Sequence, residues 1–273
     1  MTVLVTGSRG AVARHLIALL DERGLAVRAA SSTPEGPDTI RCDLTDPSTF
    51  AAALKGVTSV FLYASPSHIG AFVEEATDAG VEHIVLLSSS AVLAPNADDS
   101  VVAKSHLDVE RALTASSIHA TSLRPGSFAS NALAWSWSLR SGRPISLPFP
   151  GSHNDSIHEA DVAEAALAVL TDPGLGGRPY TLTGPESLTF AGQIDILSRV
   201  TGRPIPFRKV TREEWKEEMA EHVPAAFADS LLDWWASNDG TPVELTQAVR
   251  ELTGHPARTF ATWARDHADA FRA

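Results

Sequence analysis

The stretch VLVTGSRGAVARHL, residues 3–16, decides the fold. Its first residues are apolar and β-branched, a turn with Gly7 and Gly10 follows, and the last residues have helical periodicity. A strand, a glycine turn and a helix in this order form a cradle for a phosphate group. Gly7 allows the tight turn, and Gly10 allows the backbone to approach a pyrophosphate at the helix N-terminus. Ala13 stands where a third glycine is usual, and it is small enough for close packing. The stretch therefore predicts dinucleotide binding.

Short apolar strands alternate with helical segments through the first half of the chain. We expect strands at residues 3–6, 26–30, 59–63, 83–87 and 120–123, with helices between them. Apolar strands that alternate with helices form a parallel sheet covered on both faces. We therefore predict an α/β fold with a doubly wound parallel Rossmann sheet.

The pattern changes at RPISLPFPGSHNDS, residues 143–156, which is rich in proline, glycine and polar residues. The tail, residues 189–273, is mostly helical, with proline and glycine breaks. We expect a Rossmann core at 1–146, to which 156–183 return. A smaller, mostly helical C-terminal substrate lobe is expected at 147–155 and 184–273.

Composition excludes several classes of function. The chain has 273 residues and a net charge of −11 with histidine neutral, which argues against a nucleic-acid surface. Cys42 is the only cysteine, so an intrachain disulfide or a cysteine-based zinc cluster is impossible. The histidines have no metal-ligand spacing, and we expect no metal. Without a signal-like start or a long apolar run, we expect a cytoplasmic protein that has no membrane partner and acts on a small molecule. The oligomeric state is not predicted.

The segment after the second strand bears on the choice of dinucleotide. Proteins that bind NAD usually place an acidic residue there, to hold the ribose 2′-hydroxyl group. Here the strand ends Ala30-Ser31-Ser32-Thr33, whereas Arg9 stands in the glycine turn, where a guanidinium suits a 2′-phosphate. We therefore predict NADP, with NADPH favoured over NADH. Asp43, in CDLTD (42–46), has two interpretations: it contacts the adenine edge, or it is a turn or cap residue.

Five motifs occur in an order and spacing that resembles the NmrA-like group of atypical short-chain dehydrogenase/reductases. They are TGSRGAVA (6–13), CDLTD (42–46), HLDVERAL (106–113), LRPGSFASN (123–131) and YTLTGPESLT (180–189). The resemblance covers roughly residues 1–210. It implies a Rossmann core, a small C-terminal lobe and NADP(H) in the cleft between them. The group contains quinone and dye reductases, and also regulators that bind the nucleotide without reducing anything.

The resemblance and the glycine turn together give the predicted cofactor-binding residues. Ser32 departs from the group, because many members carry an arginine there for the 2′-phosphate. The full set is Gly7, Ser8, Arg9, Gly10, Ala11, Val12, Ser31, Ser32, Asp43, Leu44, Ala64, Ser65, Pro66, Ser88, Lys104, Pro125, Gly126 and Ser127.

The catalytic pair of the wider superfamily is incomplete. Carbonyl reductases of this kind use Tyr-x-x-x-Lys, in which the lysine lowers the pKa of the tyrosine. Here Ser100 precedes Lys104 at that spacing, and a serine hydroxyl is a much weaker acid. The candidate catalytic residues are Lys104, His106 and Ser89. Lys104 and His106 are otherwise surface residues of a helix, and Ser89 otherwise serves a turn.

A hydride acceptor that delocalises the incoming charge needs no strong acid, and placement against the nicotinamide then supplies much of the catalysis. We therefore predict an NADP(H)-dependent reductase of a conjugated or quinone-like small molecule that works by direct hydride transfer. Phe128, Asn131 and Trp135 are the predicted substrate contacts. The alternatives are an NADP(H)-sensing regulatory protein that acts through a protein partner, and a non-redox isomerase.

Overall fold

The computed structural model describes residues 1–272, which form two compact units. The first unit contains Met1–Pro125, Glu159–Leu182 and Ala248–His255, and the second contains the remaining segments. This division differs from the expected one mainly at residues 126–146, which belong to the second unit, and at 248–255, which return to the first. The six tryptophans all belong to the second unit, whereas both tyrosines belong to the first.

The first unit is built on a seven-stranded sheet in the order β3-β2-β1-β4-β5-β6-β9, with every neighbouring pair parallel. The predicted doubly wound parallel sheet is thereby confirmed. The strand order reverses between β1 and β4, which is the position where open α/β sheets bind ligands at the carboxyl ends of their strands. The strands are β1 (Thr2–Val5), β2 (Ala26–Ser31), β3 (Thr39–Arg41), β4 (Ser59–Tyr63), β5 (His83–Leu87), β6 (His119–Pro125) and β9 (Tyr180–Leu182).

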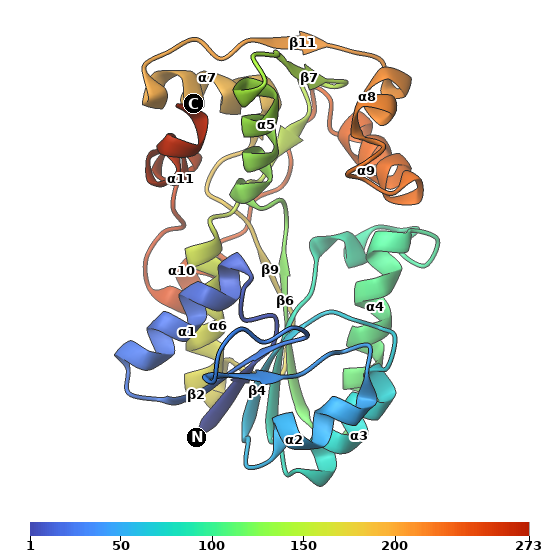
Figure 1. The fold of residues 1–273 in the computed structure, drawn as a ribbon, viewed down its shortest axis with the longest axis vertical. Helices are drawn as coiled ribbons and strands as arrows, with labels where there is room; N and C mark the ends of the chain where they lie inside the picture. Colours follow the sequence, from blue (N-terminus) through green and yellow to red (C-terminus); the bar gives the residue numbers. More distant parts are fainter. Residues whose placement is uncertain (273) are drawn as a thin grey trace. The chain divides into compact units, whose positions relative to one another are not determined.

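Helices cover both faces of this sheet (Figure 1). One face carries α1 (Ala11–Glu22), α6 (Glu159–Thr171) and α10 (Ala248–Thr253), and α6 packs against both of the others. The other face carries α2 (Phe50–Leu54), α3 (Ile69–Asp78) and α4 (Val101–Thr114). Short 3₁₀ helices η1 (Pro47–Thr49), η2 (Ser90–Leu93) and η4 (Pro173–Leu175) lie in the connections.

Strand periodicity divides the apolar side chains of the sheet between these two helical layers. Alternate strand residues pack against the layer of α2, α3 and α4, where the Phe50 and Phe72 rings meet edge to face with centroids 5.2 Å apart. The strand residues of this cluster include Leu4, Val60, Leu62, Ile84 and Leu86. Between them stand Val3, Val5, Phe61 and Val85, which are also fully buried. The sheet is therefore apolar on both faces, as a doubly wound fold requires.

The second unit is mostly helical, with two small sheets. β7 (Ile145–Leu147) pairs with β11 (Phe207–Lys209) in parallel, and β8 (His153–Asn154) pairs with β10 (Leu188–Thr189) in antiparallel. Its helices are η3 (Ala129–Ala134), α5 (Trp135–Arg140), α7 (Phe190–Thr201), α8 (Arg212–Met219), α9 (Ala225–Ser237), α11 (Phe260–Asp266) and η5 (Ala268–Phe271). Its largest core includes Ile194, Leu197, Phe260 and Trp263. Among residues 1–272, no helix is long and apolar enough to cross a membrane.

Candidate nucleotide and active site

The glycine turn lies at the carboxyl end of β1, beside the point where the strand order reverses. Gly7 has a φ of +59°, which favours glycine because a side chain would be strained there. The turn is held by hydrogen bonds from Gly10 N–H to Gly7 O (2.8 Å) and from Ser8 N–H to Ala30 O (2.9 Å). Helix α1 then begins at Ala11 without a side-chain cap at Gly10. A helix N-terminus without a side-chain cap leaves N–H groups that suit an anion.

Tyr63, the last residue of β4, packs its ring on this turn. A Cβ atom on Gly7 would lie 2.9 Å from Tyr63 Cδ2, and a Cβ atom on Gly10 would overlap the Tyr63 hydroxyl. Burial raises the pKa of Tyr63 above its usual value, and the nearby Ala13 backbone opposes this effect. Both glycines therefore serve a close approach between α1 and β4, which the sequence analysis does not identify.

A pocket of about 280 Å³ lies next to the turn, in the first unit. It contains three of the predicted cofactor-binding residues, whereas the predicted Ser32 is exposed and does not line it. The lining residues are Ser8, Arg9, Ile17, Ala29, Ser31, Glu35 and Thr39. Glu35 is a residue that sequence reasoning missed. The available signal was an acidic residue four positions after the end of β2.

Arg9 is already engaged at the edge of this pocket. Its Nη1 atom lies 2.7 Å from Glu35 Oε1, and its Nη2 atom donates to Thr33 Oγ1, also at 2.7 Å. Both charged side chains face solvent, with 57% of Arg9 and 78% of Glu35 exposed. The Ser31 hydroxyl accepts a hydrogen bond from Thr33 N–H at 3.2 Å and so shapes the loop that carries Thr33.

Asp43 serves a local turn. Its Oδ1 atom accepts hydrogen bonds from Thr45 N–H (3.0 Å) and from the Thr45 hydroxyl (2.7 Å), and these bonds hold the pKa of Asp43 below its usual value. Leu44 packs against the core cluster beneath α2 and α3. The geometry gives Asp43 the turn role of its two interpretations, and its contact with an adenine ring stays a prediction.

The segment after β4 contains Ala64, Ser65 and Pro66, at the same edge of the sheet as the glycine turn. Ala64 packs partly against the core, whereas Pro66 is exposed and accepts a hydrogen bond from Ile69 N–H at 3.4 Å. That contact leads the chain into α3. These residues occupy the edge where a nucleotide is expected, and their contact with it stays a prediction.

A buried ionic network joins the loop after β5 to β6 and α4. The Ser88 hydroxyl donates to Glu110 Oε1 at 2.5 Å. The Arg124 guanidinium donates to both oxygens of the same carboxylate, at 2.9 Å and 2.5 Å. Glu110 is only 7% exposed, so the charges of Glu110 and Arg124 compensate each other away from solvent. The hydroxyl group of Ser88, a predicted cofactor contact, already forms a hydrogen bond within this network. The neighbouring Ser89 hydroxyl accepts a hydrogen bond from Ala91 N–H and caps η2.

Lys104 and His106 lie on the first two turns of α4 with different surroundings. Lys104 Nζ bonds to both carboxylate oxygens of Asp108 at 2.8 Å and is half exposed. The buried Nδ1 atom of His106 has no hydrogen-bond partner among the described residues. Burial lowers the pKa of His106 below its usual value, and the nearby Glu110 carboxylate opposes this effect. His106 is therefore a half-buried imidazole with one nitrogen that can still form a hydrogen bond.

The chain passes from β6 into the second unit at Pro125. Ser127 N–H donates to Asp155 Oδ1 at 2.9 Å, and a Cβ atom on Gly126 would overlap the Asp155 carboxylate. Burial raises the pKa of Asp155. Gly126 thus permits a close approach of a buried carboxyl group to the loop after β6.

The predicted substrate contacts all belong to the second unit. Phe128 forms a backbone bridge with Ile157, and Asn131 is exposed. Trp135 is half-buried, with its ring edge to face against Phe190 at a centroid distance of 5.9 Å. Their contact with a substrate stays a prediction.

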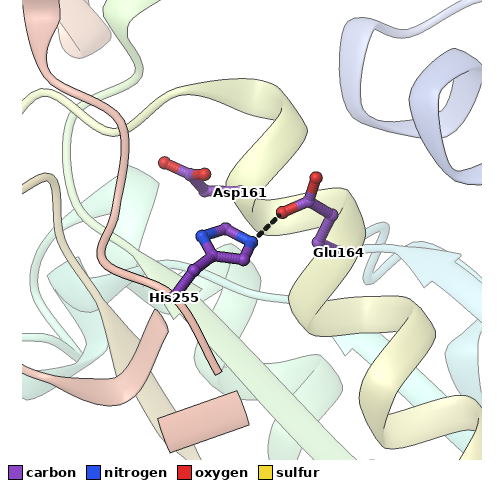
Figure 2. A group of neighbouring side chains, drawn as sticks. All are labelled: Asp161, Glu164 and His255. Carbon is purple, nitrogen blue, oxygen red and sulfur yellow. Dashed lines mark hydrogen bonds and ion pairs between the residues drawn. The ribbon is translucent and has the colours of Figure 1, made fainter. Parts of the chain in front are cut away.

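Three side chains with metal-ligating atoms meet in the first unit (Figure 2). The ligand atoms of Asp161, Glu164 and His255 lie within 4.8 Å of one another, and His255 Nε2 is 2.7 Å from Glu164 Oε2. Asp161 is fully buried. Sequence spacing missed this cluster because His255 lies 91 residues from Glu164. The contact joins the segment after α10 to α6, and nothing in the cluster points to an ion.

The parallel sheet, its reversal between β1 and β4, the glycine turn and the adjacent pocket define a Rossmann-type dinucleotide-binding protein. Residues 7–173 match a family model described as NAD(P)H-binding. The chain therefore belongs to the NAD(P)H-binding family, as an oxidoreductase of the NmrA-like, atypical short-chain group that its motifs predict.

Relatives match this chain over nearly its whole length. It is 33% identical to a (4-alkanoyl-5-oxo-2,5-dihydrofuran-3-yl)methyl phosphate reductase of Streptomyces griseus, over 98% of this chain and 99% of the relative. It is 30% identical to an NAD(P)H azoreductase of Xenophilus azovorans, over 99% of each chain. A solved triphenylmethane reductase of Citrobacter sp., in complex with NADP(H), has the same fold, with a TM-score of 0.78, 23% identity, and coverage of 98% of this chain and 100% of that one.

Proposed function

We propose that this protein is an NADPH-dependent reductase that transfers hydride directly to a conjugated or quinone-like small molecule. The observation that carries the proposal is the glycine turn at the start of α1, with the Arg9 pocket beside it. The turn suits a pyrophosphate, and the pocket suits the adenosine end of the same cofactor. Membership of an oxidoreductase family supports the redox assignment.

The residues present fit a nicotinamide dinucleotide. Gly7 and Gly10 keep side chains away from the turn, and the first N–H groups of α1 have no side-chain cap. Arg9 brings a half-exposed guanidinium to the edge of the pocket, where it can bind a 2′-phosphate. When bound, the cofactor supplies the hydride. The preference for NADPH over NADH rests on Arg9.

The chain has to deliver a proton to the reduced product, or let water do so. The tyrosine of the superfamily pair is replaced by Ser100, and Lys104 is paired with Asp108. We assign the proton to His106, because its Nδ1 atom is buried without a protein partner and its pKa is lowered. A lowered pKa makes the protonated imidazole a stronger acid. Ser89 and Lys104 stay predicted contributors.

The acceptor class follows from the missing tyrosine. A conjugated acceptor spreads the incoming negative charge, so a weak or distant acid is sufficient. The names of the relatives describe acceptors of this kind: an oxo-dihydrofuran, an azo compound and a triphenylmethane dye. Phe128, Asn131 and Trp135 are the proposed substrate contacts.

The test is the oxidation of NADPH by the purified protein over a panel of quinones, enones, azo compounds and triphenylmethane dyes. The loss of reduced-nicotinamide absorbance reports turnover, and calorimetry reports binding of NADPH and NADH. We expect turnover with at least one conjugated class and tighter binding of NADPH. Saturable NADPH binding without turnover on any class would contradict the reductase and favour the regulatory alternative.

A further inference from the structure

Glu35 lines the pocket beside the glycine turn and pairs with Arg9. We infer that Glu35 is a specificity-determining residue that limits the preference for NADPH, because its carboxylate competes with a 2′-phosphate for the Arg9 guanidinium. This inference rests on the proposed function, since it concerns the adenosine end of the same cofactor.

The competition follows from the contacts of Arg9. One terminal nitrogen of the guanidinium bonds to Glu35 and the other to Thr33, both at 2.7 Å. A 2′-phosphate binds arginine best through two parallel hydrogen bonds, and both terminal nitrogens of Arg9 already hold a protein partner. A phosphate that approaches the end of the guanidinium therefore has to displace Glu35, Thr33 or both.

Displacement is feasible because the Arg9–Glu35 pair is exposed. An ion pair that faces solvent contributes little free energy, so a doubly charged phosphate can replace the carboxylate. The displaced carboxylate nevertheless stays on the pocket wall. Arg9 and Glu35 are the charged members among the seven residues that line the pocket, so no second cation there offsets the repulsion between Glu35 and the phosphate.

The same carboxylate favours the unphosphorylated cofactor. An acidic side chain after the second strand can accept a hydrogen bond from a ribose 2′-hydroxyl group. Glu35 stands in the loop after β2, so it can take this role while it remains paired with Arg9. Arg9 and Glu35 thus act in opposite directions, and the wild-type pocket is expected to accept both cofactors with a modest preference.

The test compares 2′,5′-ADP with ADP, which differ in the 2′-phosphate, by calorimetry at low ionic strength. The variant is Glu35→Gln, which removes the charge and keeps the shape of the side chain. The control is Asp38→Asn, which makes the same charge change on the same exposed loop at a residue that does not line the pocket. We expect Glu35→Gln to tighten 2′,5′-ADP binding about three- to tenfold and to leave ADP unchanged or weaker. Asp38→Asn should change either affinity by less than about twofold.

Two results would overturn the inference: equal changes for both nucleotides, or weaker 2′,5′-ADP binding in Glu35→Gln. Arg9→Gln tests the role of Arg9 separately from that of Glu35. It should weaken the binding of 2′,5′-ADP and leave the affinity for ADP unchanged. If the wild-type protein binds neither NADPH nor NADH, the proposed function fails, and the inference fails with it. If both bind and Glu35→Gln behaves like Asp38→Asn, only the role of Glu35 fails. Thermal melts of the variants verify that each one is folded.

Discussion

The hydroxyl group of Tyr63 occupies the space that a Cβ atom on Gly10 would need. The two residues come from opposite sides of the point where the strand order reverses, since Tyr63 ends β4 and Gly10 precedes α1. The turn is therefore shaped by protein packing as well as by the demands of a ligand. Its glycines are required even before a nucleotide binds.

This contact predicts the effect of Gly10→Ala. The added methyl group displaces the Tyr63 ring or the turn, at a cost of about 1–3 kcal/mol, and NADPH binding should weaken about tenfold or more. Calorimetry with NADPH measures the loss. The matched control is Gly70→Ala, because a Cβ atom on Gly70 meets nothing within 4 Å. Adding Tyr63→Phe to Gly10→Ala should restore part of the affinity, and wild-type binding by Gly10→Ala alone would refute the explanation.

The buried network predicts a large loss of stability for Glu110→Gln. The change removes the negative charge that compensates Arg124, so the free energy of unfolding should fall by about 3–5 kcal/mol. Urea denaturation measures this fall. The control is Asp98→Asn, which breaks the exposed Arg111–Asp98 pair and should change the free energy of unfolding far less. Equal decreases in the free energy of unfolding for the two variants would contradict the prediction that the buried Glu110–Arg124 pair matters more than the exposed Asp98–Arg111 pair.

The lowered pKa of His83 predicts that the protein loses stability in acid. Burial and the neighbouring His119 lower the pKa of His83 from 6.5 to about 4, so the folded state binds fewer protons than the unfolded state between these values. Stability should therefore decrease as the pH falls from 6.5 to 4. Thermal melts of His83→Gln should show a smaller decrease over this interval. His68→Gln, at an exposed loop position, should keep the wild-type pH dependence, and an unaltered dependence in His83→Gln would count against the assignment.

The proton role of His106 predicts the pH profile of turnover. Because burial lowers the pKa of His106 below its usual value, the protonated form becomes scarce as the pH rises through this lowered pKa, and kcat/KM should fall. His106→Gln should lower kcat about 10²-fold, remove this limb of the profile and leave NADPH affinity unchanged. Steady-state kinetics with an accepted dye or quinone supplies the profile. A parallel loss of cofactor affinity, with the pH limb intact, would assign His106 a structural role instead.

The fold is predictable from the sequence because its signals are local. Val3 to Thr6 run directly into Gly7, and the apolar face of α1 follows within the same stretch. The helix-to-strand alternation then repeats along the chain, and each repeat carries its own periodicity. No contact between distant segments is needed to recognise a doubly wound sheet.

The site is less predictable because much of it depends on distant contacts. The local sequence marks Glu35 only as an acidic residue four positions after β2, and its pairing with Arg9 is not visible there because Arg9 lies 26 residues earlier. Ser88 follows β5, Glu110 lies on α4 and Arg124 lies on β6, and only the folded sheet brings them together. The membership of residues 126–146 in the second unit likewise follows from packing, since their composition does not mark a boundary at Pro125.

The separation of the tryptophans from the tyrosines gives this protein an intrinsic optical label. All six tryptophans lie in the second unit, while Gly7, Arg9 and Glu35 lie in the first, together with both tyrosines. Light absorbed at the red edge of the protein spectrum therefore excites the second unit alone. The ligand 2′,5′-ADP carries no nicotinamide and would bind in the Arg9 pocket of the first unit. A change in tryptophan emission on its binding would therefore show that the second unit responds to a ligand held by the first. The wild-type chain can thus report communication between its two units without an attached dye.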